Sequence, residues 1–301
     1  MVPILSIIIT AHNFENFINN CLISIKRCID VNENRAIEII LIDDKSNDKT
    51  SKVMMDFANS ENNNAKYFRT EFGNIGKVRN FSILNSFGKY ITFIDGDDVI
   101  PLFDLDTVLD FLVSNEVDIL ISKINDVYKD SDYIAQSNFI LPLKLTQNEA
   151  VREFLKHKKF QAHLCGKFFN RRLFDCIKIP EVVCYEDALI FPDILVISKD
   201  IFITKSVFYN YIKRIGSLSN DINPDKANIM ADAIIHMNNV FGEKYKNIIT
   251  THAVEHLLKN KRLLSGERMN YLKYMIKSVN KISYFLDPSV RFSFKRKILK
   301  L

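Results

Sequence analysis

Hydrophobic residues in the first 122 positions form short continuous runs, separated by longer segments in which they are spaced. Runs rich in β-branched and aromatic residues are typical of buried strands. We expect strands at 4–10, 37–42, 66–69, 90–94 and 117–122. Between them, apolar residues recur every three or four positions, which predicts amphipathic helices. These lie near 14–29, 53–58, 77–87 and 105–112. The alternation predicts an α/β fold with right-handed crossovers.

The second half of the chain has a less regular pattern. We expect helices at 147–156, 171–176 and 188–195, a strand at 166–169, and a strand pair at 201–204 and 207–211. The pattern over residues 125–145 predicts strand pieces and loop. From about residue 224 onward, the pattern predicts helices only. Asn13 is the predicted N-cap of the first helix, and Gly88 the predicted C-cap of the third.

The strand predicted at 90–94 leads directly into Gly96 and three carboxylates, Asp95, Asp97 and Asp98. Buried strands of open α/β sheets present their ligand-binding groups at their carboxyl ends. Three acids there repel one another unless positive charge lies between them. Mg²⁺ or Mn²⁺ meets that need, and such ions usually carry substrate phosphates. Taken alone, the motif also fits a solvated acidic turn.

The first two predicted strands end in polar or acidic residues as well. His12 and Asn13 follow the first strand, and Asp43 and Asp44 follow the second. Three strands that end in polar or acidic residues at one edge of a parallel sheet predict a ligand-binding site at that edge.

Length and composition are those of an ordinary globular protein, with 301 residues and 47% hydrophobic content. No apolar run approaches the roughly 20 residues of a membrane-spanning helix. The N-terminal apolar run is too short for a signal peptide. Five cysteines without metal-finger spacing fit a reducing compartment. We therefore expect a cytoplasmic protein.

Charge is unevenly distributed. Residues 244–301 carry a net charge of +11, whereas residues 1–243 carry −6. This shift predicts two domains, 1–220 and a basic helical 221–301, and an anionic partner for the latter. Residues 291–300 mix basic and large apolar side chains, as membrane-surface helices do. The segment is expected either to lie on the inner face of the cell membrane or to pack in a homo-oligomer. Without a recognition motif, nucleic acid is not an expected partner.

Seven short motifs occur in a fixed order along residues 3–220. They are Ser6–Thr10 with Asn13, Ile42–Ser46, Asn74–Gly76 with Arg79 and Asn80, Asp95–Asp98, Gly166–Lys167, Tyr185–Asp187 and Arg214–Ser217. In this order they resemble the family 2 glycosyltransferases of the GT-A fold, of the bacterial capsule, lipopolysaccharide or wall-polymer type. The chain departs from that pattern at Thr10, His12 and Lys45, where the family usually has Pro, Tyr and Gly. These departures affect the expected details of the nucleotide pocket, but they do not change the class of protein that the motifs indicate.

The resemblance implies a GT-A fold, with a Rossmann-like mixed sheet between helices and a C-terminal helical segment. It also implies that Thr10, His12 and Asp43 hold the base, that Arg79 faces the nucleotide and that Asp95 contacts ribose. A carboxylate such as Asp43 accepts the uracil N3–H, which favours a UDP-sugar donor over GDP or dTDP. The residues alone leave a helix-capping role for Asp43 and an exposed charge for Arg79 open.

For the diphosphate, the resemblance implies that Asp97 is the ligand of a Mn²⁺ or Mg²⁺ ion, with Asp98 as the second candidate. The ion would act as a Lewis acid on the leaving group. Lys213, Arg214 and Ser217 are similar to a late loop that closes on the diphosphate, although a solvated turn also fits them.

For catalysis, the resemblance implies that Asp187 is the general base of an in-line displacement with inversion. A hydroxyl is a poor nucleophile, so a carboxylate must take its proton in the transition state. Glu186 would orient the acceptor, a glycan or glycolipid, or serve as the base itself. The residues alone also fit two acids that favour a helix N-terminus.

Two other functions remain alternatives. A sugar nucleotidyltransferase would need a glycine-rich basic loop after the first strand, where this chain has Ala11, His12 and Asn13. A degenerate family member that acts as an assembly partner would be expected to lack the acids, which are present. The sequence does not determine the sugar, the acceptor, the linkage or the oligomeric state.

Overall fold

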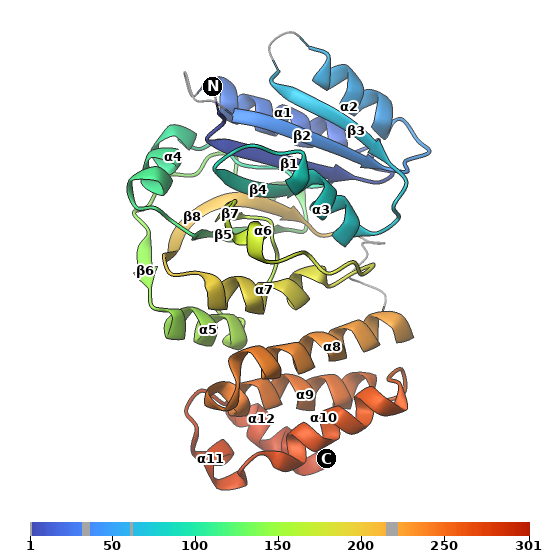
Figure 1. Ribbon diagram of the computed structural model, residues 1–301, viewed down its shortest axis with the longest axis vertical. Helices are drawn as coiled ribbons and strands as arrows, with labels where there is room; N and C mark the ends of the chain where they lie inside the picture. The colour runs from blue at the N-terminus through green and yellow to red at the C-terminus, as the bar shows by residue number, and fades with distance from the viewer. Residues whose placement is uncertain (1, 32–36, 61–62, 215–221) are drawn as a thin grey trace.

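The structure is a computed structural model, and it describes residues 2–31, 37–60, 63–214 and 222–301. In these residues, eight strands form one mixed sheet in the order β3-β2-β1-β4-β7-β5-β8-β6 (Figure 1). The strands are β1 (Leu5–Ala11), β2 (Ile37–Asp44), β3 (Ala65–Thr70), β4 (Tyr90–Asp95), β5 (Ile119–Val127), β6 (Leu143–Leu145), β7 (Lys167–Asn170) and β8 (Ile201–Ile212). β3, β2, β1 and β4 are parallel, whereas β7 is antiparallel to both β4 and β5. The predicted α/β class with a mixed sheet is confirmed.

Helices cover both faces of the sheet because alternate strand residues point to opposite sides. Leu5, Ile7 and Ile9 of β1 pack with α1 (Ile18–Asp30), α2 (Thr50–Ala58) and α4 (Leu105–Ser114). Ile8 lies in the core of the other face. The helices that contribute to that core next to the sheet include α3 (Ile75–Leu84), α5 (Gln147–Lys156), α6 (Leu173–Cys176) and α7 (Glu186–Ile197).

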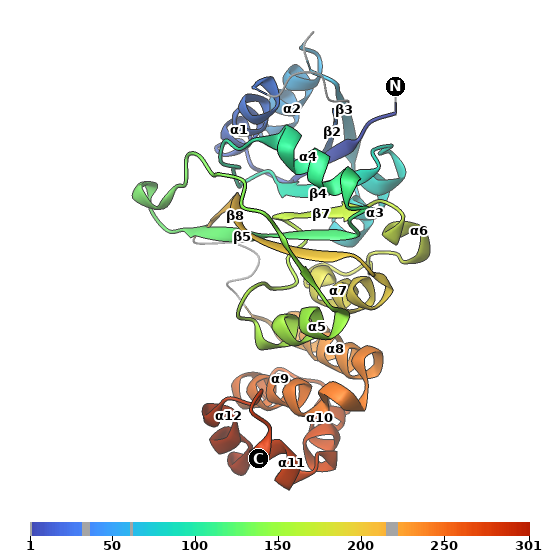
Figure 2. The same ribbon diagram turned by 90° about the vertical axis from the view of Figure 1, so that its left-hand side faces the viewer.

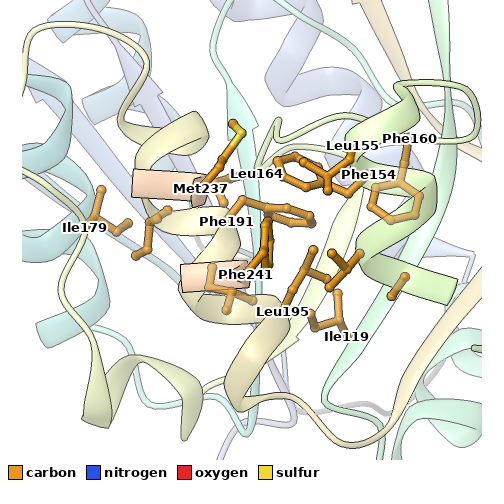
Figure 3. Close-up of a cluster of buried hydrophobic side chains, with 14 of the residues drawn as sticks. Ile119, Phe154, Leu155, Phe160, Leu164, Ile179, Phe191, Leu195, Met237 and Phe241 are labelled. Carbon is orange, nitrogen blue, oxygen red and sulfur yellow. The ribbon is translucent and has the colours of Figure 1, made fainter. Parts of the chain in front are cut away.

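The C-terminal helices form a layer at one end of the molecule, next to α5 and α7 (Figures 1 and 2). They are α8 (Pro224–Phe241), α9 (Lys246–Asn260), α10 (Gly266–Ser278), α11 (Lys281–Leu286) and α12 (Phe292–Lys297). Met237 and Phe241 of α8 share one apolar core with Phe191 and Leu195 of α7 (Figure 3). The predicted domain boundary at 220 lies outside the described residues and stays a prediction.

Two predicted helix caps were wrong. α1 begins at Ile18 rather than near residue 14, and Asn13 adopts a left-handed conformation with φ 54°. Its backbone N–H donates to Ser46 Oγ at 2.9 Å, so Asn13 ties two loops together instead of capping a helix. α3 ends at Leu84, before Gly88. Gly88 is needed for close approach, because a Cβ there would lie 2.5 Å from the backbone nitrogen of Ser6.

The strand pair predicted at 201–204 and 207–211 is one strand, β8, with irregular register against β5. Residues 125–145 complete β5 and form a short 3₁₀ turn and β6. Their pattern is weak because β6 is only three residues long and largely exposed. Across the described ranges, no helix combines the length and the apolar character that crossing a bilayer requires.

Candidate active site

The ends of β2, β1 and β4 lie side by side, as their parallel register requires. Ala11 is paired with Asp43 on one side, and Thr10 with Asp95 on the other. The N–H of Gly96 donates to the carbonyl of Thr10 at 2.8 Å, which ties the start of the loop after β4 to the end of β1. The sheet therefore brings together the acids that the sequence places after separate strands.

Asp43 is completely buried beneath residues of β3. Its Oδ2 accepts hydrogen bonds from Arg69 Nη1 at 2.9 Å and from Tyr67 O–H at 3.4 Å. Its Oδ1 accepts the backbone N–H of Ser46 at 3.2 Å. Direct contact between Asp43 and a base therefore requires Arg69, whose side chain is 43% exposed, to move aside.

His12 lies at the rim of the same region and is exposed. Its Nδ1 donates to the backbone carbonyl of Asp44 at 2.6 Å. The Asp44 carboxylate is buried and accepts from Thr70 O–H at 3.0 Å and from the backbone N–H of Phe72 at 2.7 Å. These bonds fix the loops after β1, β2 and β3 against one another.

Asp98 is buried and bound to β8 through both carboxylate oxygens. Tyr209 O–H donates to Oδ2 at 2.7 Å, and the Ile212 N–H donates to Oδ1 at 2.7 Å. Burial, followed by the charge of Asp95, raises the pKa of Asp98 to about 7. Asp98 therefore connects the loop after β4 to β8, and both its oxygens are engaged by the protein.

Asp97 is partly exposed and forms an ion pair with Arg214. The Arg214 guanidinium lies over the ring of Phe17, 4.3 Å from the ring centroid. Lys213 is turned to β5, where it pairs with Asp126 at 3.1 Å. Ser217, the third predicted residue of this loop, lies outside the described residues.

Arg79 of α3 joins the end of β4 to the start of α7. Its Nη2 lies 3.2 Å from Asp95 Oδ1, and its Nη1 donates to Glu186 Oε1. Arg79 and Glu186 are both about 95% buried. Burial and the neighbouring acids outweigh the arginine and raise the pKa of Glu186 to about 7. The pKa of Arg79 is raised as well, despite its burial, because Glu186 and Asp95 favour its charged form.

Asp187 follows Glu186 in the first turn of α7 but has different surroundings. Its side chain is 19% exposed and lies 3.4 Å from His163, measured from Oδ2 to Nδ1. The backbone N–H of Ala188 donates to Oδ1 at 2.7 Å. Burial opposes ionisation, but His163, Arg79 and this N–H more than offset it and lower the pKa of Asp187. Asp187 is therefore ionised at neutral pH.

The donor set at β4 fits a hard divalent cation only in part. Among the residues that the structure describes, no three His, Cys, Asp or Glu side chains converge on a common metal position. Mg²⁺ is typically held by one or two carboxylates together with substrate phosphates. Asp97 suits that role, because both carboxylate oxygens of Asp98 already accept hydrogen bonds from β8.

Four residues of the site were missed by the sequence analysis: Tyr67, Arg69, His163 and Tyr209. The parallel pairing of β2 and β3 sets Arg69 opposite Asp43. The contact between these two residues could therefore have been predicted from the register of the two strands. His163 lies in an irregular segment before β7, and Tyr209 lies in the middle of an apolar strand. Neither position carries a sequence pattern that indicates a site.

A family model described as Glycosyl transferase family 2 matches residues 6–178. Streptococcus pneumoniae glycosyltransferase GlyA is 23% identical over 230 residues, which are 71% of this chain and 31% of GlyA. An uncharacterized glycosyltransferase of Mycoplasma genitalium, MG060, is 28% identical over 221 residues, 71% of each chain.

A crystal structure of Staphylococcus aureus TarS residues 1–349 in complex with UDP-GlcNAc superposes with a TM-score of 0.68 at 21% identity, and covers 92% of this chain and 82% of that one. TarS is named a poly(ribitol-phosphate) beta-N-acetylglucosaminyltransferase. The structural likeness supports the fold, and the family model covers more than half of the sequence. The chain therefore belongs to glycosyl transferase family 2.

Proposed function

We propose that the protein transfers a sugar from a UDP-sugar to a hydroxyl of a glycan or lipid-linked acceptor, with inversion at the anomeric carbon. Arg79 carries this proposal, since it bonds Asp95 on the donor side and Glu186 beside the base. The nucleotide-sugar and the acceptor would thus meet between β4 and α7.

Asp187 is the general base in this proposal. It is ionised, it is partly accessible, and each of its oxygens makes only one described contact with the protein. A carboxylate oxygen has two lone pairs, so one lone pair on each oxygen remains to take the proton of the acceptor hydroxyl. Glu186 is held by Arg79 and is a positioning residue rather than the base.

Asp97 would hold Mn²⁺ or Mg²⁺ together with oxygens of the diphosphate. The ion would supply Lewis-acid stabilisation of the departing diphosphate. Arg214 would have to release Asp97 for this and would then lie close enough to bind phosphate oxygens with its forked donors. Thr10, His12, Asp43 and Arg69 would surround the base, and the UDP-GlcNAc bound to TarS supports a UDP donor.

The test is nucleotide release from UDP-GlcNAc, UDP-glucose, UDP-galactose and GDP-mannose with Mn²⁺, in the presence of wall-polymer and membrane-glycolipid fractions as acceptors. We expect acceptor-dependent release of UDP from one UDP-sugar, and none from GDP-mannose. Release from GDP-mannose alone would overturn the UDP assignment. Failure with every donor and acceptor would favour a non-catalytic binding role.

We also propose that α10–α12 dock on an anionic membrane surface, where lipid-linked acceptors reside. Residues 273–301 carry eight basic residues and one acid. Large apolar side chains stand exposed among them, including Ile282, Leu286 and Phe292, each more than 70% exposed. Exposed apolar groups with surrounding cations match an acyl boundary beneath anionic headgroups.

Vesicle sedimentation tests this surface. Binding to vesicles with 30% phosphatidylglycerol should fall severalfold in a variant with Ile282→Ser, Leu286→Ser and Phe292→Ser, and wild type should not bind phosphatidylcholine vesicles. The matched control is Leu141→Ser, which removes an exposed apolar residue outside this surface. Unchanged binding in the triple variant, or a wild-type dimer that the variant abolishes, would favour self-association instead.

A further inference from the structure

His163 is the one ionisable side chain outside α7 that lies within ion-pair distance of Asp187 among the described residues. It reaches the carboxylate from the irregular segment between α5 and β7, with Nδ1 3.4 Å from Oδ2. Its ring is 38% exposed and lies beside that of Tyr211, with centroids 5.8 Å apart. The imidazole is therefore the more exposed partner of the pair.

The contact with His163 restricts the Asp187 carboxylate but leaves acceptor capacity on its oxygens. The backbone N–H of Ala188 donates to Oδ1 at 2.7 Å, and the His163 ring lies 3.4 Å from Oδ2, so contacts from two different elements restrict the rotation of the carboxylate. With the N-terminal turn of α7 beneath it, the charged form gains further from the helix dipole.

The other charged and titratable groups around Asp187 are Arg79 of α3, Lys167 of β7, and Glu186, Tyr185 and Cys184 beside it in the chain. Arg79 is committed to Glu186 and Asp95. Lys167 donates to the carbonyl of His163 itself. His163 is therefore the group that acts on Asp187 by direct contact and faces solvent.

Lys167 anchors the segment that carries His163. It is almost fully buried, and burial lowers its pKa to about 8. Its ammonium lies 5.3 Å from the centroid of the Phe191 ring on α7. Gly166 before it has φ +65°, and a Cβ there would lie 2.8 Å from Ile124 Cγ1. This gives the Gly166–Lys167 motif a physical role, which is to hold His163 against α7.

We propose that His163 is a positioning residue for the transfer reaction: it orients the Asp187 carboxylate, while Lys167 holds the backbone of His163 in place. This inference rests on the proposed role of Asp187 as the base. His163 takes no proton from the acceptor in this scheme, and the proton ends on Asp187.

The experiment compares wild type with His163→Ala, His163→Asn and His163→Gln in the UDP-release assay, from pH 4.5 to 8.5. Asn places its amide N–H close to the position of Nδ1, whereas Gln places it further out, so the pair separates position from polarity. We expect the acid limb of kcat to move up by about one pH unit in the Ala and Gln variants, because the polar contact with the charged carboxylate is lost. His163→Asn should stay close to wild type, and KM for the UDP-sugar should not change.

Superimposable pH profiles for wild type and His163→Ala would overturn the inference, as would equal loss in the Asn and Gln variants. Asp187→Asn is measured alongside. If it keeps full activity, then the proposed base is wrong. If it is inactive while the His163 variants match wild type, then only the positioning role fails. Circular dichroism confirms that each compared variant is folded, and His163→Asn provides the test if His163→Ala is not.

Discussion

Two pairs of neighbouring acids, Asp97–Asp98 after β4 and Glu186–Asp187 at the start of α7, are built in the same way. In each pair one carboxylate is locked by the protein: Asp98 by Tyr209 and Ile212, and Glu186 by Arg79. The pKa of each locked acid is raised to about 7, chiefly by burial.

The other member of each pair is partly exposed and has a side-chain partner from a more exposed segment. Asp97 contacts Arg214, and Asp187 contacts His163. In the proposed function the two acids of each pair have separate tasks: the locked acid fixes the backbone, and its neighbour meets a ligand. Which acid is locked differs between the pairs, because the order depends on where the buried partner lies.

The strongest test of this division is the removal of the working acid at α7. Asp187→Asn should lower the rate of transfer by about 10²–10⁴-fold, the usual contribution of a general base. The midpoint of urea unfolding should stay close to that of wild type. A variant that keeps its activity but unfolds at lower urea would reverse the roles of the two acids.

Removal of the locked acid at α7 should chiefly affect stability. Glu186→Ala leaves the buried Arg79 charge without its closest partner, which typically costs about 3–5 kcal/mol in the free energy of unfolding. Urea unfolding followed by circular dichroism measures the loss. The matched control is Asp187→Ala, and an equal loss in that variant would remove the distinction between the two positions.

At β4 the effect should be smaller. Asp98→Ala leaves the Tyr209 hydroxyl and the Ile212 N–H without their acceptor, and each unsatisfied buried group costs about 1–3 kcal/mol. Asp97→Ala should unfold near the wild-type midpoint, because its partner Arg214 is partly exposed. If Asp97→Ala were the less stable of the two variants, then Asp97 would be the structural acid.

The last expected effect is in the pH dependence of stability. The pKa of Glu186 is raised to about 7 in the folded protein, so the folded state binds more protons than the unfolded state between about pH 4.5 and 7. Stability should therefore fall as pH rises through this window. Glu186→Gln removes this proton uptake, and its melting temperature should vary less with pH. Parallel curves for the two proteins would contradict the raised pKa.

The sequence predicts which residues lie together at the site more completely than it predicts the contacts that each of them makes. Strand periodicity and parallel pairing are local and regular, so Asp43 and Asp95 could be brought to one edge of the sheet, and Glu186 and Asp187 to a helix start. The locking contacts come from distant parts of the chain, since Tyr209 lies 111 residues from Asp98 and Glu186 lies 107 residues from Arg79.

The wrong helix caps have a similar cause. Asn13 and Gly88 carry the residue types of caps, but tertiary contacts with Ser46 and Ser6 decide their conformations. Burial of Asp43 beneath Arg69 could not be predicted from Asp43 alone, because it depends on the end of β3. Residue type therefore indicated where polar groups gather, and packing determined which of them remain accessible.

The most direct test of the proposed UDP and metal site is the thermal stability of wild type and Asp97→Ala with UDP, with Mn²⁺, and with both. A ligand at about 100 times its dissociation constant stabilises the folded state by roughly 2.7 kcal/mol, which raises the melting temperature by several degrees. We predict that wild type shifts fully only with UDP and Mn²⁺ together, and that Asp97→Ala loses the contribution of the metal. A wild-type shift that Asp97→Ala retains in full, or no wild-type shift with UDP and Mn²⁺ together, would contradict the proposed donor site.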